Sequence, residues 1–365
     1  MIVGFISCDT QTKNSSAIIR YNCSDDSILL HAVFNPKSYV VYRANSPIVI
    51  DGVDNENDWT LTPDVGSFWE CHNGESSGGE IQNPVKLLWD TDYLYVFSKM
   101  YEPHVWVDRL KNDGLELNDL FQLFIDFNND GVNVLSIAIN PINNINSNLY
   151  SNRGSEQSDF NKVFIDGIIS KVLVRGTIND PSDIDEYWCV EMKIPISKIN
   201  EKSKGKSTLA PDIWRINFCR TKNFITSVEG IYKRTIDSKS GMISTGTKLV
   251  WAPINVENLL IPELYGFVKF SNNKAGRNIE SFDIDISERL KWELRTIYYA
   301  QKVYFFNNNK YASSLRKLQK DGLLIKKMDY EYQFNVDDNK YEVIGHIDNE
   351  KESWKINDLG IVRQN

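Results

Sequence analysis

The chain has 365 residues, with 41 basic and 49 acidic side chains and a formal net charge of -8. This acidic balance, with no block of lysine or arginine, argues against a nucleic-acid-binding surface, because neutralising phosphates requires clustered positive charge. Hydrophobic residues form 41% of the chain and include 17 Phe, 17 Tyr and 9 Trp, enough for a large core, so wholesale disorder is excluded. No run of 18 apolar residues occurs, so no membrane-spanning helix is predicted. A neutral or weakly polar ligand is favoured.

Residues 1–37 are expected to hold a signal remnant, a polar tether and a first segment. Met1 to Cys8 resembles the end of a bacterial lipoprotein signal, in which an apolar run precedes an acylated cysteine, but the basic region and most of the apolar region are missing. Two alternatives stay open: an exported lipoprotein anchored through Cys8 in the periplasm, outer membrane or cell surface, and an ordinary N-terminal tail. The other four cysteines form no C-x-x-C pair, which disfavours a disulfide framework or a thiolate metal site.

Residues 38–272 contain short strand-like runs separated by turn residues. The predicted strands are residues 38–43, 48–50, 86–89, 93–98, 120–126, 134–140, 168–175, 188–194, 214–219 and 267–270. With no helical periodicity between them, they predict a mainly β fold, an antiparallel, jelly-roll-like β-sandwich. Alternation in 188–194 points Trp188 and Met192 to the core and Glu191 to a polar face. In 214–219, Arg215 and Asn217 fall opposite the core, on a face that either lines a cleft or is solvated.

A series of motifs in residues 42–270 resembles the family-9 carbohydrate-binding modules, which share a DOMON-like sandwich. In chain order they are Ile50-Asp51-Gly52, Asp58-Trp59, Leu88-Trp89-Asp90-Thr91-Asp92-Tyr93-Leu94-Tyr95-Val96, Asn118-Asp119, Phe124-Ile125-Asp126, Gly176-Thr177-Ile178-Asn179-Asp180, Tyr187-Trp188-Cys189-Val190-Glu191, Trp214-Arg215-Ile216-Asn217-Phe218-Cys219-Arg220, Trp251-Ala252-Pro253 and Pro262-Glu263-Leu264-Tyr265-Gly266-Phe267. The resemblance implies a β-sandwich that binds the end of a saccharide, sometimes with structural calcium, and has no catalytic machinery.

The same resemblance places the expected sugar site. The family's acidic position falls on Gln122, and the following strand retains Ser136 and Asn140 as polar groups. The two stacking tryptophans of the family fall near Glu116 and Leu259, so neither is present; Trp106, Tyr150 or Trp251 are the neighbouring aromatic residues that can replace them. The predicted ligand-binding residues are Gln122, Ser136, Asn140, Trp106, Arg220 and Trp251.

The segment Asp126-Phe127-Asn128-Asn129-Asp130-Gly131 fits the first half of a calcium-binding loop, with Asp126, Asn128 and Asp130 as ligands. The twelfth position, where a bidentate glutamate is expected, is Ile137. A hairpin turn is the alternative, because Asn, Asp and Gly also favour turns. No other cofactor is predicted. The four histidines form no H-E-x-x-H motif and no serine has a G-x-S-x-G context, so motif evidence for an enzyme is absent.

Residues 280–365 read differently from the sandwich. Apolar spacing from Leu290 to Phe305 predicts a helix capped by Asp285 or Ser287, followed by a short helix near 315–318. Alternating runs at 330–336 and 341–347 predict a hairpin, with a last strand at 353–356. The segment also weakly resembles the helix-then-sheet head of pilin-like subunits. It is either a small α+β cap on the sandwich or a docking module for a protein partner.

These observations favour a non-catalytic carbohydrate-binding protein of the cell surface or periplasm, with an oligo- or polysaccharide as its partner, that supports polysaccharide capture or degradation. The alternative is a structural or partner-binding protein built on a sandwich that has lost its sugar site. A third hypothesis, a glycoside-active enzyme, rests on no identifiable pair of carboxylates.

Overall fold

The computed structural model describes residues 32, 34–71, 83–108, 115, 118–150, 165–202, 213–236, 238, 241–244, 246–254, 256, 258–277, 280, 282–324, 328–347 and 352–365. Cys8, the predicted lipidation site, lies outside these residues. Within them, no helix is long and apolar enough to cross a membrane.

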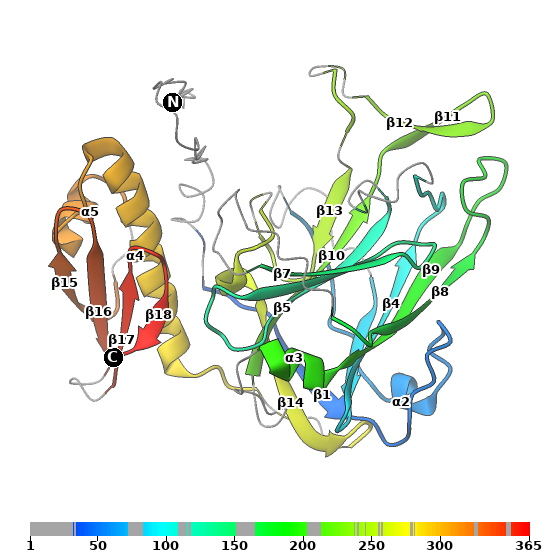
Figure 1. The fold of residues 1–365 in the computed structure, drawn as a ribbon, viewed down its shortest axis with the longest axis horizontal. Coiled ribbons are helices and arrows are strands. Elements are labelled where there is room, and N and C mark those ends of the chain that lie inside the picture. The colour runs from blue at the N-terminus through cyan, green and yellow to red at the C-terminus, as the bar shows by residue number, and fades with distance from the viewer. Residues whose placement is uncertain are drawn as a thin grey trace.

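The larger part of the chain is one curled twelve-stranded sheet (Figure 1). Its main path runs β7-β6-β5-β10-β14-β1-β3-β4-β9-β8, and β13 pairs with both β10 and β2. The bounds are β1 Ser38–Arg43, β2 Trp69–Glu70, β3 Val85–Trp89, β4 Tyr93–Tyr101, β5 Leu120–Asp126, β6 Val134–Ile139, β7 Ile145–Tyr150, β8 Ile169–Arg175, β9 Tyr187–Pro195, β10 Ile213–Lys222, β13 Thr247–Val250 and β14 Gly266–Lys274. A separate ribbon, β11 Ile225–Val228 and β12 Ile231–Arg234, projects from it. Helices α2 (Asn57–Thr60) and α3 (Ile196–Lys202) and the 3-10 turn η3 (Pro262–Leu264) are short.

The mainly β fold predicted from the sequence is confirmed, with one correction to strand direction. β1 runs parallel to both of its neighbours, β14 and β3, whereas the other pairings in the sheet are antiparallel. The sheet is therefore mixed. The predicted strand at residues 48–50 is not formed, and this stretch belongs to the loop before α2.

Inward-facing side chains from both halves of the sheet form one core. Val96, Met192 and Ile194 from β4 and β9 belong to the same buried cluster as Leu123 and Phe218 from β5 and β10. Side chains of strands far apart in the sheet meet because the sheet curls over itself, which produces the two layers of a sandwich. Burial of this many aliphatic and aromatic groups is the main force that holds the fold together.

Glu191 lies on the second face of β9, opposite the core, as predicted, but this face is covered. This carboxylate is fully buried and accepts hydrogen bonds from the backbone N–H of Asp51 (2.8 Å) and Gly52 (2.9 Å) and from Trp59 Nε1 (3.0 Å). The loop and helix α2 cover this face, so Glu191 anchors them to the sheet. Burial raises the pKa of Glu191, while the three hydrogen bonds act in the opposite direction.

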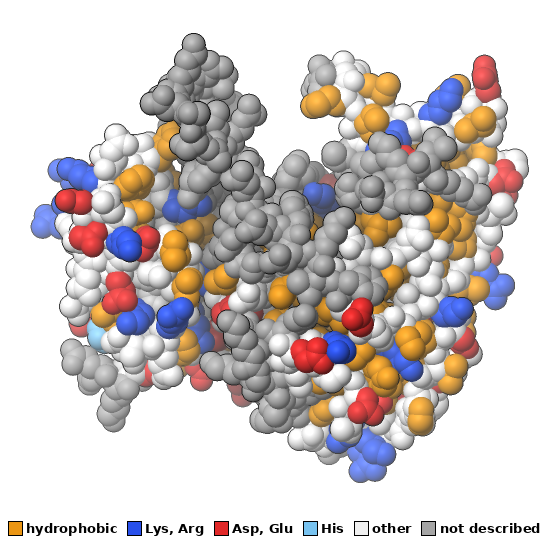
Figure 2. Space-filling model, in the orientation of Figure 1, with side chains coloured by type: hydrophobic (Ala, Val, Ile, Leu, Met, Phe, Trp, Pro, Cys, Tyr) orange, Lys and Arg blue, Asp and Glu red, His pale blue; other side chains and the backbone are white. Residues whose placement is uncertain are grey.

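The C-terminal subdomain, residues 280–365, is a long helix packed on a small antiparallel sheet. Helix α4 (Ile286–Asn308) is capped by Asp285, whose side chain accepts from Ser287 N, and ends at Asn309 in the left-handed region. It packs on the sheet β15-β16-β17-β18 (Glu331–Val336, Tyr341–Ile347, Glu352–Asn357, Val362–Gln364), with α5 (Leu315–Lys320) alongside. The predicted helices and strands are present, and β18 is additional. On the face shown in Figure 2, acidic and basic side chains are interspersed over this subdomain.

Candidate functional site

Three neighbouring strands place polar side chains on one face of the sheet. Gln122 of β5 pairs with Ala138 of β6, which pairs in turn with Asn146 of β7. In the next row, Phe124 pairs with Ser136, which pairs with Asn148. Residues paired across a sheet point to the same face. Because Leu123 and Ile137 point into the core, these residues are on the opposite side. We call this surface the β5–β7 polar face, defined by Gln122, Ser136, Asn146 and Asn148.

The chemistry of the β5–β7 polar face is that of neutral hydrogen bonding. Gln122, Asn146 and Asn148 are partly exposed, and Ser136 is 5% exposed. The Oδ1 atom of Asn148 is buried and has no hydrogen-bond partner within the described residues. Carboxamides and hydroxyls both donate and accept, so the face can match the hydroxyl pattern of an uncharged ligand. Tyr150, at the end of β7 and on the same face, adds an aromatic edge.

Two of these polar residues were missed in the sequence analysis. Asn146 and Asn148 lie in β7, where Ile145, Ser147 and Leu149 alternate with them. This alternation of polar and apolar residues indicates a strand, and its polar side chains extend the face that carries Gln122 and Ser136. Asn140, which was predicted to bind ligand, follows β6 directly and takes part in a turn. Its Oδ1 accepts from Asn144 N at 2.9 Å and closes the β6–β7 connection.

Arg220 belongs to a buried ion cluster on the core side of β10. Its Nη2 atom lies 2.8 Å from Glu102 Oε2, and its Nη1 donates to Asn83 Oδ1 at 3.0 Å. Asp119 lies close by and accepts from the backbone N–H of Trp106 at 3.2 Å. Burial, and then the charge of Glu102, raise the pKa of Asp119 to about 7. The predicted residues Arg220 and Trp106 therefore lie near one carboxylate, away from the β5–β7 polar face.

Neither predicted tryptophan presents a stacking surface. Trp251 has no exposed area, donates from Nε1 to Val65 O at 2.7 Å and packs against Phe218. Trp106 is 7% exposed, and the guanidinium of Arg234 lies 5.3 Å from the centre of its ring. The expectation that these two rings replace the family's stacking tryptophans is therefore not met by their positions. Their burial depends on tertiary packing, which local sequence does not reveal.

The face of β10 that the sequence left open as a cleft or a solvated surface is largely covered. Asn217 is buried, donates to Ala252 O at 3.0 Å and accepts from Ala252 N at 2.8 Å. Leu259, at the second expected tryptophan position, lies in the apolar cluster that also contains Leu290 and Leu294 of α4. The segment after β13 and helix α4 thus occupy much of this side.

The predicted calcium loop is a hairpin turn in which Asp126, Asn128 and Asp130 use their side-chain oxygens within the turn, except for Asp126 Oδ1. Asp126 Oδ2 accepts from Gly131 N at 2.9 Å. The Asp130 carboxylate accepts from two following backbone N–H groups and from Asn128 Nδ2. The guanidinium of Arg295 lies 3.4 Å from Asp130 O, where it supplies positive charge. In the described part of the chain, no group of three His, Cys, Asp or Glu side chains is placed to hold a metal ion. These residues do not fit a calcium cage of Asp126, Asn128 and Asp130.

Comparison with known proteins gives structural matches only. No family model and no curated protein matches the chain. Among solved structures, a family-9 carbohydrate-binding module from Caldicellulosiruptor kristjanssonii in complex with cellotriose is 17% identical, covers 67% of this chain and all of its own, and has a TM-score of 0.41. The glucose complex of a family-9 module from this organism is 19% identical over 68% of this chain and 100% of its own, with a TM-score of 0.39.

A third similar structure is a putative carbohydrate-binding protein from Bacteroides uniformis. It is 13% identical, covers 65% of this chain and all of its own chain, and has a TM-score of 0.43. Family-9 modules are thus among the structural matches over about two-thirds of the chain, at low sequence identity.

Proposed function

We propose that the protein is a non-catalytic carbohydrate-binding protein and that the saccharide lies on the β5–β7 polar face. The observation that carries this proposal is the placement of Gln122 and Ser136. These positions were taken from the family-9 resemblance of the sequence, and the fold brings them to one face with Asn146 and Asn148. The buried, unpartnered Oδ1 of Asn148 is an acceptor that a sugar hydroxyl would satisfy.

The physical basis is a match between neutral donors and acceptors and the hydroxyl groups of a sugar. Amide and hydroxyl side chains form directional bonds without the desolvation cost of a full charge. Among the described residues, Tyr150 is the partly exposed aromatic side chain on this face, so binding is expected to be weak, with selectivity arising from hydrogen bonds.

The test is calorimetric titration of the folded protein with glucose and cellotriose, followed by a glycan array of several linkages. Removing one hydrogen bond costs about 1 kcal/mol, so Asn148→Ala and Gln122→Ala should each weaken binding roughly fivefold. Gln333→Ala, an exposed amide on β15 of the C-terminal sheet, is the matched control and should bind as the unaltered protein does. Silence across the array with folded protein would remove the proposal.

A second candidate is a structural or partner-binding protein on a sandwich that no longer binds sugar. It is favoured by the positions of Trp106 and Trp251, which are both buried, and of Leu259, which packs toward α4. The same array separates the two, because this candidate predicts no saccharide binding. Release of reducing sugar from polymeric substrate would instead favour a glycoside-active enzyme.

We also propose export to the periplasm or cell surface, with a role in polysaccharide capture or degradation. The support is the lipoprotein-like run that ends at Cys8. Metabolic labelling with a palmitate analogue tests this, and a Cys8→Ser variant should lose the label. A cytoplasmic, unlabelled protein would contradict it.

A further inference from the structure

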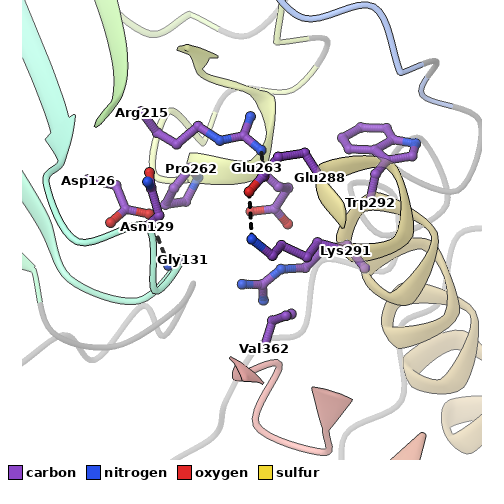
Figure 3. Close-up of a pocket in the computed structure, with 11 residues that line it drawn as sticks. Asp126, Asn129, Gly131, Arg215, Pro262, Glu263, Glu288, Lys291, Trp292 and Val362 are labelled. Atoms are coloured by element: carbon purple, nitrogen blue, oxygen red, sulfur yellow. Dashed lines mark hydrogen bonds and ion pairs between the residues drawn. The ribbon is translucent and has the colours of Figure 1, made fainter. Parts of the chain in front are cut away.

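A pocket lies at the junction between the sandwich and the C-terminal subdomain (Figure 3). About 400 Å³ of unfilled space, part of it open solvent, lies between its walls, and we call it the seam pocket. The sandwich contributes Asp126, Arg215 and Glu263 to its walls, and helix α4 contributes Glu288, Lys291 and Trp292. Neither part forms the pocket alone.

The charges around the seam pocket are balanced. Arg215 Nη2 lies 2.8 Å from Glu288 Oε2, across the junction, and Lys291 Nζ lies 2.6 Å from Glu288 Oε1. Arg215 also donates to Tyr265 O at 3.2 Å. Together with Arg295, the basic groups that line the pocket equal the carboxylates of Asp126, Glu263 and Glu288 in number. Burial raises the pKa of Asp126 to about 7, so the net charge of the pocket stays small and gives little attraction for a phosphate or a free metal ion.

One buried acceptor in the seam pocket lacks a partner. Asp126 is 1% exposed, and its Oδ2 accepts from Gly131 N, but its Oδ1 has no hydrogen-bond partner among the described residues. A buried acceptor without a donor is costly and points to a missing partner. A ligand that fills this position must donate a hydrogen bond.

The opposite wall supplies an aromatic surface. Trp292 is partly exposed on α4 and lines the pocket beside the ion pairs (Figure 3). Indole packs against the C–H groups of a sugar ring, while the polar groups around it exchange hydrogen bonds with hydroxyls. A neutral ring with several hydroxyl groups fits all three features. It needs no net charge in the pocket, its hydroxyls can donate to the unpartnered acceptor, and its C–H groups can pack on the indole.

We propose that the seam pocket is a second ligand site, which binds a single neutral sugar ring between the sandwich and α4. It is distinct from the β5–β7 polar face. Asp126 and Gln122 share one side of β5 but are four residues, roughly 13 Å, apart along the strand, and the buried side chain of Phe124 stands between them. Because its walls come from both parts, an occupied seam pocket also strengthens the docking of the C-terminal subdomain.

The experiment uses the full chain, labelled with ¹⁵N and titrated with D-glucose, while the indole N–H resonance of Trp292 is followed. That resonance is assigned by its loss in Trp292→Phe. We expect glucose to shift it, and Asp126→Asn, which keeps the shape of the side chain, to weaken the effect about tenfold. Phe306→Ala, at an exposed position on the same helix, should leave the titration unchanged.

The outcomes separate the two sites. The inference is supported if Asn148→Ala leaves the Trp292 titration intact. It is overturned if glucose never shifts Trp292, if Asp126→Asn titrates as the unaltered protein, or if Asn148→Ala abolishes the shift. In the first two cases, binding at the β5–β7 polar face can persist and the proposed function stands. Circular dichroism of each variant verifies that it is folded.

Discussion

The role of Arg220 gives the sharpest prediction, because sequence and structure assign it differently. The sequence places it in the sugar site, whereas the structure places it in a buried ion cluster, 4% exposed. We expect Arg220→Met to destabilise the protein and to leave saccharide affinity unchanged. The variant keeps the aliphatic part of the side chain and removes the guanidinium that pairs with Glu102.

The magnitude follows from the partners that are lost. Breaking a buried pair costs about 3–5 kcal/mol, because the remaining charge stays buried. Lys222 Nζ lies 3.2 Å from Glu102 Oε1 and still compensates part of the carboxylate charge in the variant, so we expect the cost to lie near about 3 kcal/mol, the lower end of this range. Asn83 Oδ1 and Tyr101 O each lose a donor as well, at about 1 kcal/mol apiece. The sum is roughly 5 kcal/mol.

Urea unfolding monitored by tryptophan fluorescence measures this loss. With a slope of about 3 kcal/mol/M, the midpoint should fall by more than about 1 M. Arg289→Met is the control, since its ion pair with Asp329 is exposed and should contribute less than about 1 kcal/mol. The double variant Arg220→Met with Glu102→Leu should be less destabilised than the sum of the single variants. A loss below 1 kcal/mol, or a selective loss of sugar binding, would refute the structural role.

Three further predictions concern pH, packing and metal. The folded-state pKa of Asp119 is about 7 against an ordinary 3.8, so its contribution to stability is present at low pH and is lost as pH rises from about 4 to 7. The free energy of unfolding should fall by at most about 1.4 kcal/mol per pH unit over this range. Urea unfolding at several pH values should show that Asp119→Asn flattens this fall. Trp251→Phe should destabilise by about 1–3 kcal/mol through the lost bond to Val65 O, with glucose affinity unchanged by calorimetry, and a selective affinity loss would contradict its core position. Most side-chain oxygens of the Asp126–Gly131 turn accept hydrogen bonds within it, so excess calcium should move the thermal midpoint by less than about 1 °C relative to EDTA. A rise of several degrees would show that the turn binds the ion.

Periodicity predicted the faces of individual strands well. Trp188, Met192 and Ile194 alternate in the sequence and are fully buried in the core, as are Ile216 and Phe218 in β10. It did not show that Glu191 is buried, because the cover over the second face of β9 comes from a loop more than a hundred positions earlier in the chain. The parallel direction of β1 was equally hidden, since it arises from pairing with a distant strand.

The sequence likewise predicted only part of the candidate site. Gln122 and Ser136 share a face because strand pairing and alternation place them there, and Asn148 was within reach of the same argument. Trp251 and Arg220 were misplaced because composition does not show whether a ring or a guanidinium packs inward. The sequence did not indicate Trp292 as a site residue, because its place in the seam pocket depends on how α4 packs against the sandwich.

The position of β1 has a consequence for synthesis of the chain. β1 pairs on one side with β3, which follows soon after it, and on the other with β14, where Tyr39 lies beside Val268. On the ribosome, the central ladder between the two halves of the sheet cannot close until β14 has emerged from the exit tunnel. Until then β1 presents an unpaired edge, so we expect the nascent sandwich to be open to chaperones or to wrong strand partners for most of its translation.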